Sequence, residues 1–140
     1  MEIDRDVYYE NAINTLKNLE SNMDLVGNSL FMLGCNVTAE LFLSSVCAIA
    51  SPRYGLAIST HSPRFLIDVI WKYAEFDFDF KDIQFLDDNN LLAESALYEK
   101  KLITEELCKK MLEVLFRLEV AVNGFRQRIG LRTQEFFFEI

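Results

Sequence analysis

Few side chains in this sequence are of a type that performs catalytic or metal-binding chemistry. Among its 140 residues there is one His, and the three Cys form no CxxC pair. No glycine-rich phosphate loop, dinucleotide fingerprint or HExxH pair occurs. A single His also excludes a multi-His metal site and most Ser–His or Cys–His nucleophile arrangements. We therefore expect no metal and no cofactor, and we assign no catalytic residue.

Two isolated residues could nevertheless bind a ligand. Glu40 is the only acid inside an otherwise apolar segment and has no obvious carboxylate partner. It is either a buried acid hydrogen-bonded to a neighbouring helix end or Tyr, or a carboxylate that faces a ligand with a shifted pKa. His61 precedes a helix start and either caps or packs there, or acts with Glu40 on a substrate. Acid–base catalysis requires both groups within reach of that substrate, and sequence spacing does not show this.

Three arginines near the end of the chain are the candidate anion-binding groups. Arg126, Arg128 and Arg132 could hold a phosphate or an acidic partner, or they are solvated cations at a helix C-terminus. The net charge of −8 repels nucleic acid at long range. However, residues 68–99 carry nine acids and two bases, whereas residues 100–140 carry six acids and eight bases. A basic face on the last helix is therefore compatible with an acidic chain.

The elements that position these residues are predicted to be helices. A 3.6-residue apolar period and helix-start residues predict helices over 9–23, 38–50, 63–73, 87–98 and 104–129. Ser62 and Thr104 are expected caps, Gly130 an expected terminator, and Gly34 the site of a bend. Residues 76–80 alternate Phe with Asp, which indicates an extended segment or an edge strand.

The sequence therefore predicts an all-α fold, an antiparallel bundle of about five helices with a Phe-rich C-terminal tail. Residues 1–140 form one domain, with 131–140 as the tail. Phe136, Phe137 and Phe138 are expected to dock in the chain's own core or on a second copy. The uncharged runs that flank Glu40 are too short to span a membrane. Apolar surroundings for all three Cys, and no signal peptide, indicate a reducing, cytoplasmic location.

The order of these features resembles the HEPN (higher eukaryotes and prokaryotes nucleotide-binding) family of small helical bundles. In that family a buried second helix bears a Glu followed by an Ala-rich apolar run, and residues 39–50 look like that element. Residues 60–66, Thr-His-Ser-Pro-Arg-Phe-Leu, are similar to the family's entry to the third helix. Residues 97–99 and 104–106 resemble its Arg-Tyr turn and the Thr-Glu-Glu start of its final helix.

The departures from the family pattern affect what can be carried over. Ser44 stands where a Lys is common, and Leu97 replaces the Arg of the Arg-Tyr turn. The only His follows Arg53 by eight positions, whereas the ribonuclease members have an Arg, four to six residues and then a His later in the bundle. The catalytic residues therefore do not transfer. The resemblance implies a non-catalytic member that pairs with a small nucleotidyltransferase or dimerises as a nucleotide- or partner-binding module.

Three functions remain open at this point. The first is a non-enzymatic interaction module that forms a homodimer through the last helix and the Phe-rich tail. The second is a HEPN-like partner that binds nucleotide or RNA through its arginines. The third is an enzyme, either a ribonuclease or one that uses Glu40 with His61. A viral or mobile-element interaction protein whose bundle only looks like the family is a further alternative. We expect a protein that acts by binding.

Overall fold

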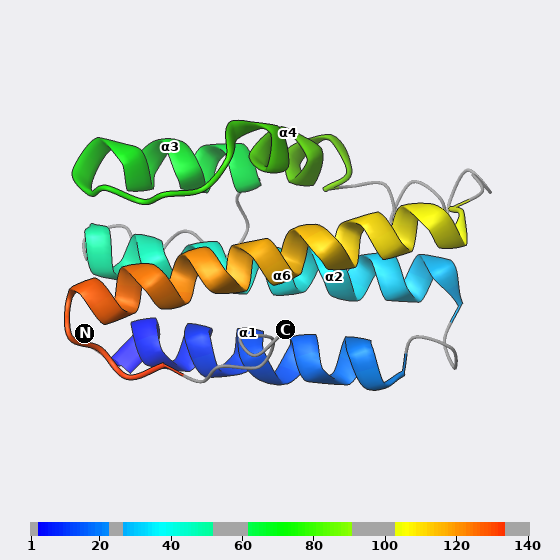
Figure 1. Cartoon of the computed structure of the whole chain (residues 1–140), viewed down its shortest axis with the longest axis horizontal. Helices are drawn as coiled ribbons and strands as arrows, with labels where there is room; N and C mark the ends of the chain where they lie inside the picture. The colour runs from blue at the N-terminus through cyan, green and yellow to red at the C-terminus, as the bar shows by residue number, and fades with distance from the viewer. Residues whose placement is uncertain (1–2, 23–26, 52–61, 91–102, 134–140) are drawn as a thin grey trace.

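The computed structural model describes residues 3–22, 27–51, 62–90 and 103–133, with side chains from residue 6 onward. These ranges contain five helices and no strand: α1 (Ile3–Ser21), α2 (Asn28–Ala50), α3 (Pro63–Tyr73), α4 (Phe80–Asp88) and α6 (Glu105–Arg128). The long helices α1, α2 and α6 lie side by side, with α1 antiparallel to the other two, and α3 and α4 lie along one edge (Figure 1). The predicted all-α bundle is confirmed.

Helix α2 is the centre of the bundle because it packs against α1, α3 and α6. The prediction of a buried helix at 38–50 is confirmed, but α2 begins ten residues earlier and is continuous through Gly34, where we expected a bend. Gly34 instead serves a close helix contact. A Cβ at this position would lie 2.6 Å from Cδ2 of Leu19 on α1, so a side chain here would force the Leu19 side chain to shift.

By length and composition, α2 is also apolar enough to cross a membrane, and it is the one such helix among the described residues. Two-thirds of its most apolar window is buried inside the bundle. Its apolar side chains are therefore mostly used in contacts with α1, α3 and α6, as in a core helix.

The expected helix caps are present. Ser62 Oγ accepts a hydrogen bond from the Phe65 amide at the start of α3, and Thr104 Oγ1 accepts one from the Leu107 amide at the start of α6. The α6 helix ends where predicted, because Gly130 follows it with a φ of 78°.

The Phe–Asp run is an extended segment, which is one of the two alternatives predicted for it, and it is not a strand. The extended part is shorter than expected. The rings of Phe76 and Phe78 are buried, whereas Phe80 is half-exposed and is already the first residue of α4. Helix α4 was not predicted. Asp79 caps it by accepting a hydrogen bond from the Lys81 amide at 2.7 Å. The prediction that a helix starts at residue 87 is wrong, because residue 87 lies in the last turn of α4, which ends at Asp88. The rest of the predicted helix, residues 91–98, lies outside the described residues.

Candidate binding surface

The predicted ligand-binding residues do not form one site. Glu40 lies half-exposed on α2, where partial burial raises the pKa of its carboxyl, and no hydrogen bond or ion pair joins it to the described residues. Ser44, one turn further on, is buried. His61 and the three consecutive Phe at 136–138 lie outside the described residues.

Arg126 is part of the core. Only 3% of it is exposed, and its guanidinium lies 4.1 Å from the ring centre of Tyr9 on α1. Nη2 donates to Oδ1 of Asp6 at 2.8 Å, and Nε donates to the Arg132 carbonyl oxygen at 2.9 Å. The side chain of Arg132 is exposed and donates to Glu10 at 3.1 Å. Both arginines therefore tie the end of α6 and the residues after it to α1.

Arg128 lies on a different face of α6 and faces α3. Its Nη2 donates to the carbonyl oxygen of Glu75 at 3.3 Å, and its side chain is otherwise exposed. Three surface hollows meet at Arg128, because it lines each of them. It is therefore a predicted residue that the structure does place beside a possible ligand space.

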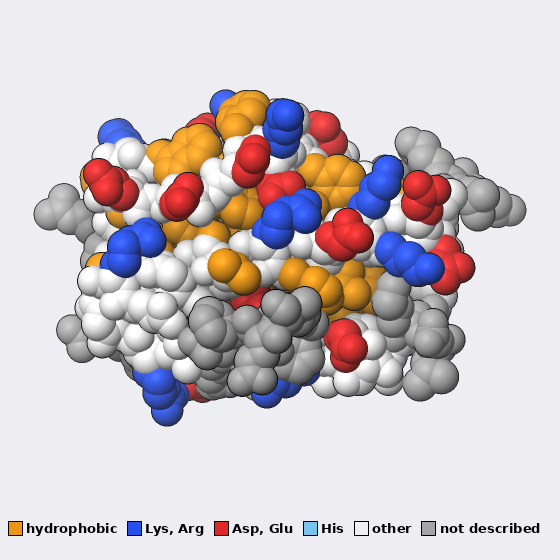
Figure 2. Space-filling model, viewed as in Figure 1, with side chains coloured by type: hydrophobic (Ala, Val, Ile, Leu, Met, Phe, Trp, Pro, Cys, Tyr) orange, Lys and Arg blue, Asp and Glu red, His pale blue; other side chains and the backbone are white. Residues whose placement is uncertain are grey.

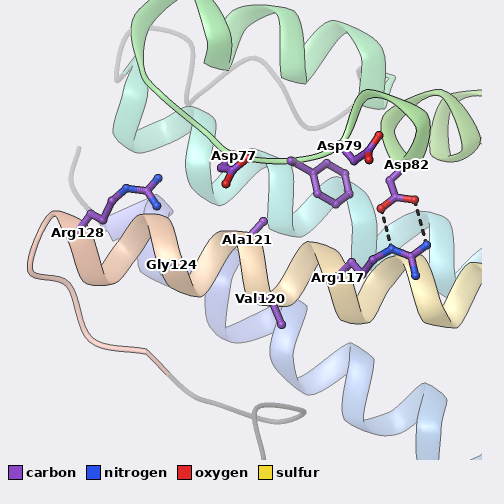
Figure 3. A pocket seen from close by; sticks show the side chains of 9 residues that line it. Asp77, Asp79, Asp82, Arg117, Val120, Ala121, Gly124 and Arg128 are labelled. Atoms are coloured by element: carbon purple, nitrogen blue, oxygen red, sulfur yellow. Dashed lines mark hydrogen bonds and ion pairs between the residues drawn. The ribbon is translucent and has the colours of Figure 1, made fainter. Parts of the chain in front are cut away.

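The first hollow, of about 290 Å³, lies between α6 and the segment that leads into α4. Figure 3 shows Arg128 and Arg117 at its two ends along α6, with Gly124 and Ala121 between them and the acids Asp77 and Asp79 on the opposite side. Small side chains on α6 leave room between the two elements.

One end of this hollow is closed by an ion pair. Nε and Nη2 of Arg117 donate to the two carboxylate oxygens of Asp82 at 2.7 and 3.0 Å (Figure 3). The side chain of Asp82 is mostly buried, and this two-point contact raises the pKa of Arg117. These two charges are therefore already matched to each other.

The other two hollows continue past Arg128 toward the end of α3. One, of about 540 Å³, is lined by Trp71, Glu75 and Asp77 among others, and the other, of about 360 Å³, by Tyr73 and Ile129. We call the three together the Arg128 groove. The residues that line it include Trp71, Tyr73, Glu75, Asp77, Asp79, Asp82, Arg117, Val120, Gly124 and Arg128.

Large aromatic side chains are exposed along the same edge of the molecule. Trp71 is 39% exposed, Tyr73 is 50% exposed, and Phe65 and Phe80 are also exposed. On the face seen in Figure 2, hydrophobic side chains lie between acidic and basic ones over α3, α4 and α6. Exposed aromatic rings with charged neighbours are typical of surfaces that contact another molecule.

No group of three or more potential metal ligands from His, Cys, Asp and Glu occurs within the described ranges. The acids of the groove therefore do not form such a group.

Sequence reasoning selected Arg128 but missed the acids and rings around it. The signal for the acids was present, because alternation over 76–79 buries Phe76 and Phe78 and so exposes Asp77 and Asp79. The rings of Trp71 and Tyr73 gave no such signal, since their place beside α6 depends on tertiary packing.

Comparison with known proteins gives no family model, no curated protein and no solved structure that matches this chain.

Proposed function

We propose that this chain acts by binding another protein through the Arg128 groove and the exposed rings beside it. The observation that carries the proposal is the meeting of three hollows at Arg128, bordered by the exposed side chains of Trp71 and Tyr73. Trp, Tyr and Arg are the residues that most often dominate the binding energy of protein interfaces.

A nucleotide or RNA is the competing ligand, as the resemblance to the HEPN family implies. The groove favours it less than a protein. Arg126 is buried and Arg132 is paired with Glu10, so neither adds its charge to that of Arg128. The acids of the groove repel phosphate.

Two candidate partners follow from the predictions made above. A small nucleotidyltransferase is the partner that the family resemblance implies. A second copy of this chain is the other candidate partner. The homodimer predicted from Phe136, Phe137 and Phe138 uses a different part of the chain, so a second copy bound at the groove would be an additional contact. The proposal requires a protein partner at the groove in either case.

A site-specific photo-crosslinker tests the proposal in the full chain. Val120 lies at the rim of the groove and is 54% exposed, so a long, flexible crosslinking side chain placed there can reach an occupant of the groove. Leu30 on α2 is 60% exposed but lies outside the groove, which makes it the matched control. We expect a discrete protein adduct from position 120 and none from position 30 after irradiation in the native cell.

Mass spectrometry identifies the adduct. A second copy of the chain or another protein, captured from position 120 alone, supports the proposal. Adducts of equal yield from both positions, adducts with nucleic acid, or none from position 120 overturn it.

A further inference from the structure

We infer that the segment bound in the Arg128 groove is basic and places Lys or Arg side chains against Glu75, Asp77 and the rings of Trp71 and Tyr73. This inference rests on the proposed function and names the class of its partner. It follows from the charges that the groove leaves unmatched, from the rings beside them and from the donors that remain on Arg128.

The carboxylates of Glu75 and Asp77 are both exposed at the groove. No hydrogen bond or ion pair joins either of them to another described residue. Asp82 is different, because its two oxygens are occupied by Arg117. Asp79 is partly satisfied by the helix amide of Lys81.

The charge balance of the groove is therefore negative. Among the residues that line the hollows, once Asp82 and Arg117 are counted as a matched pair, three carboxylates (Glu75, Asp77 and Asp79) face one guanidinium (Arg128), which leaves an excess of two negative charges. A bound segment that brings two cations neutralises this excess. The net charge of −8 on the whole chain also attracts such a segment before contact.

The rings beside these acids are suited to cations. The Trp71 indole is held in place, because its Nε1–H donates to the Phe76 carbonyl oxygen at 3.0 Å. Rings on this edge already accept cations from the chain itself: Arg64 lies 4.8 Å from the ring centre of Phe80. Lys72 lies 5.7 Å from that of Tyr73, close to the outer limit of such contacts. A guanidinium or ammonium between a ring and a carboxylate gains both interactions.

Arg128 contributes a different contact. Its Nη2 donates to the Glu75 carbonyl oxygen, which leaves other N–H groups of the fork directed toward the groove. Carbonyl oxygens of an extended backbone accept such bonds without requiring an acidic side chain. A basic peptide can thus pass Arg128 with its backbone and place its side chains at Glu75 and Asp77.

Trp71 supplies the readout, because it is the only Trp in the chain and stands at the groove. The probe is a synthetic dodecapeptide of alternating Arg and Ser, titrated against the full chain at about 50 mM salt, where surface charges are weakly screened. The matched probes are a Glu–Ser dodecapeptide and a short oligouridylate. We expect a shift in Trp71 emission with the basic peptide alone.

Two double variants separate the groove from general charge attraction. Glu75→Gln with Asp77→Asn removes two charges at the groove, and Glu105→Gln with Glu106→Gln removes two at the start of α6. The second pair lies about 35 Å away along the helix. All four side chains are exposed, and the ion pairs of Glu105 and Glu106 with Lys109 and Lys110 are exposed as well, so we expect all variants to fold. We expect about tenfold weaker peptide binding for the groove variant and less than about twofold for the control.

The outcomes distinguish this inference from the proposed function. Equal losses in both double variants, no emission shift with the basic peptide, or stronger binding of either acidic probe overturn the inference. If the crosslinker at position 120 captures a protein, and the yield of this adduct is unchanged by Glu75→Gln with Asp77→Asn, the proposed function is supported. The inference that the partner is basic is then overturned.

Discussion

The guanidinium of Arg126 lies 4.1 Å from the ring centre of Tyr9, which brings together two residues on opposite ends of the chain. The Tyr9 hydroxyl also donates to Oδ1 of Asn123 at 2.6 Å in the core. Both contacts join α1 to the last turns of α6. Because Arg126 also donates to Asp6, the closure of α1 onto α6 depends on a buried charge rather than on apolar packing alone.

We predict that Arg126→Ala lowers the free energy of unfolding by about 2–3 kcal/mol, from lost stem packing and two lost hydrogen bonds. Arg126→Met should recover part of this loss, because an apolar side chain of similar length fills the space and needs no partner. Nη1 of Arg126 has no hydrogen-bond partner among the described residues, which makes the replacement easier. Urea unfolding followed by circular dichroism measures all three proteins.

Arg132→Ala is the control for this prediction. Its ion pair with Glu10 is exposed, so the cost is less than about 1 kcal/mol. A loss for Arg132→Ala as large as that for Arg126→Ala would contradict the assignment of Arg126 as the stabilising residue.

Two helical glycines should respond in opposite ways to the same substitution. A Cβ at Gly124 would meet only Nη1 of Arg128 at 3.7 Å, so Gly124→Ala gains helix propensity and stabilises by about 0.5–1 kcal/mol. A Cβ at Gly34 would overlap Cδ2 of Leu19, so Gly34→Ala loses this gain to crowding. We expect the two variants to differ by about 1–2 kcal/mol in thermal or urea unfolding.

The cause at Gly34 can be checked in a second background. In Leu19→Ala the obstructing methyl group is gone, so adding Gly34→Ala should no longer destabilise. If Gly34→Ala costs the same in both backgrounds, the close approach of α1 and α2 is not the reason.

The three thiols should be unreactive in the folded chain. Burial raises the pKa of Cys47 to about 11, and it also raises the pKa of Cys35 and of Cys108. Since the thiolate is the reactive form, we expect alkylation at pH 8 to be at least about 100-fold slower in the folded chain than in urea. Mass spectrometry of the alkylated protein counts the modified residues, and fast labelling of any one thiol in the native state would contradict its burial.

The same shift predicts how stability depends on pH. Above pH 9 the unfolded chain loses the Cys47 proton while the folded chain retains it, so stability falls as pH rises toward about 11. The slope due to this residue is about 1.4 kcal/mol per pH unit. Because Tyr and Lys titrate in the same range, the measurement compares the original chain with Cys47→Ala, whose slope should be smaller by that amount.

Local signals in the sequence were sufficient for most of the fold. The side-chain caps at Ser62 and Thr104 and the left-handed Gly130 act over one helical turn, so their effect is visible without tertiary structure. Helix α4 was missed because it has only nine residues and its first residue, Phe80, also continues the Phe–Asp alternation. At Phe80 the two-residue period of an extended segment overlaps with a helix start. The helix begins there because the Asp79 side chain caps it.

The candidate site was less predictable than the fold. Arg126 and Arg128 are two positions apart, and two residues rotate a helix by about 200°, so they face nearly opposite sides of α6. This separation could have been derived from the sequence. The meeting of Arg128 with Trp71 and Glu75 could not, since it depends on where the end of α3 packs against α6.

The bidentate pair between Arg117 and Asp82 should contribute more than an ordinary surface ion pair, because it joins α4 to α6 and one partner is mostly buried. A double-mutant cycle with Arg117→Gln and Asp82→Asn should give a coupling free energy of about 1 kcal/mol, reduced by high salt. The control is the Arg64–Asp68 pair, whose side chains are both exposed within one helix and whose cycle should give about 0.3–0.5 kcal/mol. Equal coupling for the two pairs would mean that the contact at the end of the Arg128 groove does not hold α4 on α6, and the groove would then need another support at this end.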